Sequence, residues 1–211
     1  MAPSPPVQCL VTLDVEGVLT PEVWIALAEN LKIDALRKTT KDEPDYQLLM
    51  DGRLRILREH NVGMEQIRSV IATLSPLDGA YDFLQSLQSR FPVILLSDTF
   101  EDFIEPLMEK LGQPTILCHK LNISKDGEIM DFHPRIKDQK KHAVQAFRKL
   151  NYKIIAAGDS YNDLSMIDAA DAGFLFRSPD NVRTERSDLV ALDTYVDLFK
   201  VICETEQGFT Q

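Results

Sequence analysis

Two acidic segments hold the residues whose types and spacing best suit chemistry. In Asp14-Val15-Glu16-Gly17, two carboxylates stand two positions apart and precede a glycine. One carboxylate of such a pair can attack phosphorus, while the other protonates a leaving oxygen and then activates water. Gly17 allows the backbone to turn sharply beside a phosphate. An acidic surface loop with a glycine turn explains the four residues equally well.

The second acidic segment is Gly158-Asp159-Ser160-Tyr161-Asn162-Asp163. Its polar groups follow an apolar run and precede a predicted helix, so they offer the hard oxygen ligands that Mg²⁺ prefers. Helix capping is the alternative, since Asp and Ser are good caps. A cap needs one such residue, whereas this segment carries four polar groups.

Two further segments could bind a phosphate. Ser97-Asp98-Thr99 follows the apolar run PVILL and precedes a predicted helix, where a hydroxyl and free backbone N–H groups form a phosphate cradle. Ordinary helix capping is again the alternative. A basic run comprises Arg135, Lys137, Lys140 and Lys141. A phosphoryl site needs a cation, and the pattern alone does not say which lysine points inward.

The elements expected to position these groups alternate between strand and helix. Short apolar runs at 7–13, 92–96 and 153–157 predict buried parallel strands, which end at Asp14, Ser97 and Asp159. Residues 115–123 and 128–132 predict a hairpin around Asp126-Gly127. Helices are expected at 78–90, 101–111, 140–150, 161–170 and 195–203. This alternation predicts an α/β fold with a mainly parallel sheet, whose ligands bind at the carboxyl ends of the strands.

Residues 21–73 interrupt this alternation. Apolar side chains there recur at helical spacing, and no run is typical of a strand, which predicts a small helical insert. The whole chain of 211 residues suffices for one α/β domain and such an insert.

Composition narrows the function classes. A net charge of −10 argues against broad contact with nucleic acid, and no apolar stretch is long enough to span a membrane. The three scattered cysteines make neither a disulfide framework nor a zinc site, and the first residues do not resemble a signal peptide. We therefore expect a cytoplasmic protein.

The segments occur in the order of the four motifs of the haloacid dehalogenase (HAD) superfamily, which the chain resembles. The motif segments are DVEGVLT, LLSDT, the lysine cluster and GDSYND. Within the superfamily, PEVW, RLRIL, VIATL and CHKL resemble phosphoserine phosphatases of the ThrH type, which are bifunctional phosphoserine phosphatases and homoserine phosphotransferases. The resemblance implies a Rossmann-like core at 7–20 and 75–211, with a small α-helical (C1-type) cap at 21–74.

The resemblance also implies roles for individual residues. Asp14 would be the nucleophile, Glu16 the general acid and base, and Lys140 the motif lysine, with Lys137 as the alternative. Mg²⁺ would be held by Asp14, Glu16 (through its backbone carbonyl), Asp159 and, in support, Asp163. Substrate would be contacted by Arg53, which would clamp a carboxylate, and by Ser97, Asp98, Asn162 and Glu22.

The activity that this resemblance implies is hydrolysis of O-phospho-L-serine through an aspartyl-phosphate, in serine biosynthesis. Transfer of the same phosphoryl group to homoserine would serve threonine biosynthesis. Two alternatives stay open: a phosphatase for another small phosphomonoester, and a catalytically silent binding protein on this fold. Homodimers are common among such relatives. The chain departs from most of the superfamily at Glu16, where Asp is usual, and at Val18, where Thr is usual; the ThrH type shares both features.

Overall fold

A seven-stranded, mostly parallel sheet is the framework of the molecule. The computed structural model describes residues 8–39, 42–43 and 45–209, so the predicted strand start at position 7 and the last two residues of the predicted core lie outside the described residues. The strands are β1 (Gln8–Leu13), β2 (Val93–Phe100), β3 (Ile116–Ile123), β4 (Ile129–His133), β5 (Tyr152–Gly158), β6 (Ala172–Phe176) and β7 (Val190–Leu192).

The strand order is β4-β3-β2-β1-β5-β6-β7, which puts β1 at the centre. Strand β1 pairs in parallel with β2 on one side and with β5 on the other. The chain therefore leaves the centre of the sheet in both directions, and ligands bind at such a switch point. Only β3 and β4 pair antiparallel among the described strands, as the hairpin prediction required. The predicted fold class is confirmed.

Helices cover both faces of the sheet and fill the segment between β1 and β2. They are α1 (Val23–Leu31), η1 (Asp34–Arg37), α2 (Tyr46–Glu59), α3 (Met64–Thr73), α4 (Ala80–Gln88), α5 (Glu101–Lys110), α6 (Gln139–Lys149), η2 (Tyr161–Asp163), α7 (Leu164–Ala169), α8 (Asp180–Glu185) and α9 (Tyr195–Phe209). None of the helices in the described part of the chain is long and apolar enough to cross a membrane.

Alternate side chains of β1 enter two apolar clusters on opposite faces of the sheet. Val11 and Leu13 belong to a large cluster that includes side chains of α4 and α9. Leu10 belongs to a smaller cluster with α6 and α7. This two-residue period is what a strand imposes on its side chains, and burial on both faces fixes the register of β1.

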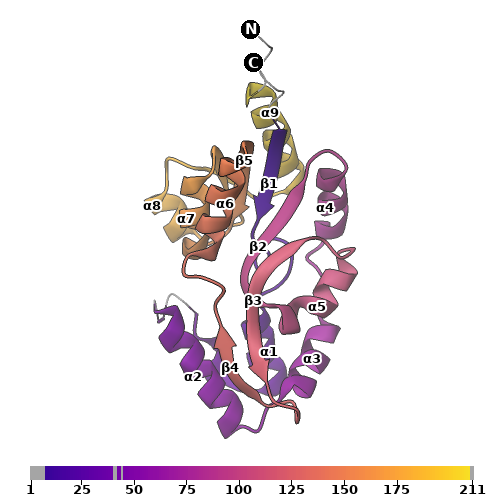
Figure 1. Cartoon of the computed structure of the whole chain (residues 1–211), viewed down its shortest axis with the longest axis vertical. Coiled ribbons are helices and arrows are strands. Elements are labelled where there is room, and N and C mark those ends of the chain that lie inside the picture. Colours follow the sequence, from indigo (N-terminus) through magenta and orange to yellow (C-terminus); the bar gives the residue numbers. More distant parts are fainter. Residues whose placement is uncertain (1–7, 40–41, 44, 210–211) are drawn as a thin grey trace.

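Helices α1, α2 and α3 lie with the β3–β4 hairpin at one end of the molecule, opposite the end that holds α9 (Figure 1). The hairpin contacts these helices directly. The backbone N–H of Met64 donates to the carbonyl of Gly127 (2.9 Å), and a guanidinium nitrogen of Arg58 donates to the carbonyl of Met130 (2.6 Å). Trp24 and Leu27 of α1 also join the large apolar cluster of the sheet.

Some local features differ from the sequence predictions. The second strand does not end at Ser97, because β2 continues to Phe100, directly before α5, which begins at Glu101 as predicted. The prediction that Ser97 stands at a helix N-terminus is therefore wrong. The reason is that β2 keeps pairing with β3 beyond β1, with Phe100 opposite His119. Helix α8 and strand β7 were not predicted.

Candidate active site

Asp14 is the first residue beyond the central strand. Its backbone N–H donates to the carbonyl of Ala157 (3.0 Å), and its side chain is buried. The chain then turns at Gly17, which has φ +77° and donates its N–H to the carbonyl of Thr20 (2.8 Å). A Cβ on Gly17 would lie 2.6 Å from the carboxylate of Asp159. The glycine is therefore required both by its backbone angle and by the close approach of the two acidic segments.

Lys140, in the first turn of α6, joins the two acidic segments. Its Nζ lies 2.7 Å from Oδ1 of Asp14 and 2.7 Å from Oδ1 of Asp163. The lysine side chain is only 3% exposed, so these charge-assisted hydrogen bonds are shielded from water. Lys137 is exposed, so Lys140 is the one of the two alternative lysines that the structure brings to the carboxylates.

Asp163 is fully buried and organises the second acidic segment. Its Oδ2 accepts hydrogen bonds from the backbone N–H groups of Asp159 and Ser160, each at 3.0 Å. A Cβ on Gly158 would lie 2.4 Å from the side chain of Asp163, so only glycine allows this fold-back. Asp163 therefore sets the direction in which Asp159 leaves the end of β5.

Three carboxylates at this edge of the sheet fit a divalent cation. Asp14, Asp159 and Asp163 each offer an oxygen atom, and these atoms lie within 4.8 Å of one another. Burial, followed by the charge of Asp163, raises the pKa of Asp14 well above its usual range and that of Asp159 to about 7. The one positive charge of Lys140 does not offset the charge of three carboxylates, whereas a bound cation would. The oxygen donor set is the one that Mg²⁺ prefers.

Glu16 turns away from this cluster. Its Oε2 lies 3.4 Å from the backbone N–H of Val23 at the start of α1. Burial, together with the nearby charge of Glu22, raises the pKa of Glu16 to about 8. A pKa raised in this direction favours the protonated form of Glu16, which a general acid requires. The side chain of Glu22 itself stands beside Glu16 at the solvent-exposed start of α1.

Ser97 and Asp98 lie in β2, next to the end of β1. The Ser97 side chain is buried, and its Oγ accepts a hydrogen bond from the backbone N–H of Thr99 (3.2 Å). Oδ2 of Asp98 accepts from the side-chain amide of Asn162 (3.1 Å). Burial acts to raise the pKa of Asp98, but Lys140 and the other donors hold it below its usual range. Asp98 is therefore an anion throughout the neutral range.

Arg53 approaches the site from α2. Its guanidinium stacks over the ring of Trp24 (4.5 Å to the centroid) and donates to the carbonyl of Lys38 (2.7 Å). Burial lowers the pKa of Arg53 to about 10, which leaves the group charged at neutral pH. Its Nε is buried and has no hydrogen-bond partner in the described residues. A buried donor without a partner is costly, and an anionic ligand would satisfy it.

Sequence reasoning assigned no site role to Tyr46 or His119, and it named Thr99 only as part of the phosphate-binding segment. The Tyr46 hydroxyl donates to the carbonyl of Asp98 (2.8 Å), and Thr99 hydrogen-bonds the carboxyl of Glu16. His119 is buried with Nε2 3.6 Å from Oδ1 of Asp98. The sequence signal for Tyr46 was its position seven residues before Arg53, which puts both on one face of α2.

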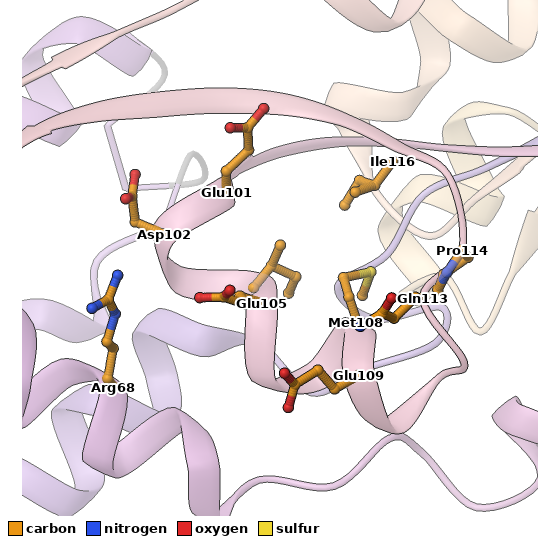
Figure 2. Close-up of a pocket in the computed structure, with 10 residues that line it drawn as sticks. Arg68, Glu101, Asp102, Glu105, Met108, Glu109, Gln113, Pro114 and Ile116 are labelled. Atoms are coloured by element: carbon orange, nitrogen blue, oxygen red, sulfur yellow. The ribbon is translucent and has the colours of Figure 1, made fainter.

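Two cavities of the described surface lie away from the carboxylate cluster. One of about 530 Å³ is lined by side chains of α5 and by Arg68 of α3 (Figure 2). A second, of about 570 Å³, lies between α3 and the hairpin turn. No residue of the carboxylate cluster lines either of them.

Comparisons with known proteins agree with this geometry. A family model described as a haloacid dehalogenase-like hydrolase matches residues 10–171. Phosphoserine phosphatase ThrH of Pseudomonas aeruginosa is 53% identical over 186 residues, which cover 88% of this chain and 91% of that protein. A phosphoserine phosphatase of Pseudomonas syringae pv. tomato is 52% identical over 188 residues, or 89% of this chain and 79% of its own.

Solved structures share the fold. An apo phosphoserine phosphatase has a TM-score of 0.73 at 19% identity, and a phospho-aspartyl intermediate analogue of phosphoserine phosphatase has a TM-score of 0.74 at 18% identity. Each comparison covers 89% of this chain and 94% of the solved chain. At such low identity, the likeness carries the fold alone.

Proposed function

The chain belongs to the haloacid dehalogenase-like hydrolases, and we propose that within this family it hydrolyses O-phospho-L-serine with Mg²⁺ as cofactor. The observation that carries the proposal is the contact of buried Lys140 with both Asp14 and Asp163 at the ends of the central strands. The relatives named phosphoserine phosphatases support the choice of substrate.

The proposed reaction has two steps. A carboxylate oxygen of Asp14 attacks phosphorus, the bond to the serine oxygen breaks, and that oxygen takes the proton of Glu16. Water then gives a proton to Glu16 and attacks the aspartyl-phosphate, which releases phosphate and restores Asp14. A raised pKa for Glu16 suits both roles, because the group must begin protonated and later accept a proton.

Lys140 and Ser97 serve the phosphoryl group in this scheme. Lys140 already holds one oxygen of Asp14, which fixes the orientation of the nucleophile. The buried Ser97 hydroxyl supplies a donor for a phosphoryl oxygen. Asp14 and Asp159, supported by Asp163, would hold Mg²⁺, with the Glu16 carbonyl as the further proposed ligand. When bound, Mg²⁺ offsets the charge of the phosphoryl oxygens.

Recognition of the amino-acid part is proposed for the helical segment 21–74, which would act as the cap of a core at 7–20 and 75–211. The unpartnered Nε of Arg53 supports a role as the clamp for the substrate carboxylate. Glu22 and Asn162 are exposed, and both are proposed to contact the substrate, with the Glu22 carboxylate binding the substrate amine. Asp98 is proposed to act beside them, next to the phosphate subsite.

Transfer of the phosphoryl group to homoserine is a second proposed activity. It is supported by Glu16 and Val18, which the chain shares with the ThrH type, and by its identity to the Pseudomonas aeruginosa protein. We also propose a cytoplasmic location, because the three cysteines are buried and free. Homodimerisation stays a prediction from the resemblance.

The decisive experiment measures phosphate release from phosphoserine with Mg²⁺, with and without homoserine, and follows phosphohomoserine by mass spectrometry. Wild-type protein is expected to release phosphate, and EDTA or Asp14→Asn is expected to abolish release. Asp51→Asn, an exposed position on α2, is the control and should retain full activity. Activity on another phosphomonoester but none on phosphoserine would overturn the substrate and the role given to Arg53.

A further inference from the structure

Asp98 is the residue at which four elements of the site meet. Its carbonyl accepts the hydroxyl of Tyr46 from α2 (2.8 Å). Its Oδ2 accepts the amide of Asn162 from η2 (3.1 Å) and lies 3.6 Å from Nζ of Lys140 of α6. Its Oδ1 faces Nε2 of His119 of β3, also at 3.6 Å. The direction of this one carboxylate therefore affects both Lys140 and Asn162.

His119 has a fixed tautomer and a fixed ring position. Its Nδ1 accepts the backbone N–H of Arg135 (3.3 Å), so the proton of the neutral ring is on Nε2 and points at Asp98. Arg135 is itself anchored, because its guanidinium donates to the Cys118 carbonyl and to the Glu101 carboxylate. The backbone N–H of Arg135, which sets the tautomer of His119, is thus fixed in position by the contacts of its own side chain.

The surroundings of His119 are those of an aromatic core. The ring centroids of Tyr46 and Phe100 lie 6.0 and 6.2 Å from that of His119, which is 3% exposed. A leucine or phenylalanine would fill this space as well as an imidazole. Burying two polar nitrogens there is costly unless both are paired, and one partner is a carboxylate of the site.

We propose that His119 is a positioning residue, which acts through Asp98 to keep Lys140 and Asn162 in place for phosphoryl transfer. This inference rests on the proposed function, because the reaction it serves is the one proposed for Asp14. His119 contacts neither the nucleophile nor the carboxylate cluster in the described structure. The effect of His119 on turnover is therefore expected to vanish when the Asp98 carboxylate is removed by substitution.

The first test does not depend on turnover. Long-range ¹H–¹⁵N spectra of ¹⁵N-histidine-labelled protein are expected to show His119 with an unprotonated Nδ1 and a protonated Nε2 at neutral pH. Asp98→Ala should shift the Nε2 signal, whereas the signals of exposed His142 on α6 should stay unchanged. A protonated Nδ1 with bare Nε2, or no response to Asp98→Ala, would overturn the proposal.

The second test measures turnover of phosphoserine, or of p-nitrophenyl phosphate if only that ester is hydrolysed. His119→Leu keeps the apolar packing and removes both nitrogens, so kcat is expected to fall about tenfold with little change in KM. His119→Gln can accept at one end and donate at the other, and should recover kcat to within about threefold of wild type. His142→Leu is the matched control, with wild-type kcat.

A double-variant cycle separates positioning from general destabilisation. In the Asp98→Ala background, His119→Leu should lower kcat by less than about twofold, because the link is already broken. A full tenfold loss in both backgrounds, or a loss confined to the melting temperature with wild-type kcat, would overturn the proposal. If wild-type protein hydrolyses no phosphomonoester, the proposed function fails, and the spectra still decide whether His119 holds Asp98.

Discussion

Arg53 offers the sharpest test of substrate recognition, because one change in the substrate matches one change in the protein. Phosphoethanolamine is phosphoserine without its carboxylate. Arg53→Met keeps an apolar chain of similar length against Trp24 but removes the guanidinium whose Nε is buried without a partner. If this group binds the substrate carboxylate, the variant should lose activity on phosphoserine and keep it on phosphoethanolamine.

The magnitude follows from the hydrogen bonds at stake. The group is charged, since its pKa of about 10 lies well above neutrality. A hydrogen bond to a charged partner contributes about 1.5–3 kcal/mol, and two of them would contribute about 3 kcal/mol or more. At about 1.4 kcal/mol for each factor of ten, kcat/KM for phosphoserine should fall at least ~100-fold.

The assay compares kcat/KM for the two substrates in wild type, Arg53→Met and Arg55→Met. Arg55 lies on the same helix but its side chain is 73% exposed, so its variant should match wild type on both substrates. The ratio of the two kcat/KM values is the decisive quantity. An equal loss on both substrates, at unchanged melting temperature, would refute the assignment of Arg53 to the carboxylate.

Three further predictions concern the metal, the acid and the glycine turn. Mg²⁺ should raise the melting temperature of wild type, and Asp159→Asn should remove most of that rise, as followed by scanning fluorimetry against EDTA. Burial and Glu22 raise the pKa of Glu16 from 4.5 to about 8. Ionisation of Glu16 is therefore less favourable in the folded than in the unfolded state, and the free energy of unfolding of wild type should fall as pH rises through that window. The melting advantage of Glu16→Gln should therefore grow with pH, and a pH-independent difference would contradict this reasoning. Gly17→Ala should destabilise the protein by about 1–3 kcal/mol in urea unfolding, whereas Gly52→Ala, inside α2 with open space around the added Cβ, should stabilise it.

The fold was predictable where sequence pattern and burial agree. The apolar runs of β1, β2 and β5 predicted strands correctly, because side chains on both faces of a buried parallel sheet are apolar. Strand β7 was missed because it has three residues in an acidic stretch, too few to show a period. The end of β2 was misplaced because polar residues from Ser97 on usually signal a loop, whereas here pairing with β3 extends the strand to Phe100.

The sequence predicted which strand-end residues come together at the candidate site, but not the individual contacts between their side chains. Asp14 and Asp159 follow adjacent parallel strands, so their proximity follows from topology alone. The choice between Lys137 and Lys140 was left open, since helical phase near a helix start is not fixed by sequence. The contact of Tyr46 with Asp98 spans 52 positions and depends on how α2 lies against the sheet, which no local pattern encodes.

The β3–β4 hairpin, which extends from the sheet to α2 and α3, limits which segments of this chain can be exchanged with those of a relative. A side chain at Gly63 would stand 3.1 Å from the carbonyl of Gly127, and Met64 and Arg58 donate to backbone carbonyls of the same hairpin. Residues 21–74 therefore do not form an exchangeable cassette on their own. We therefore expect a chimera that imports this segment from a relative to fold stably only when it imports the matching 116–133 hairpin with it.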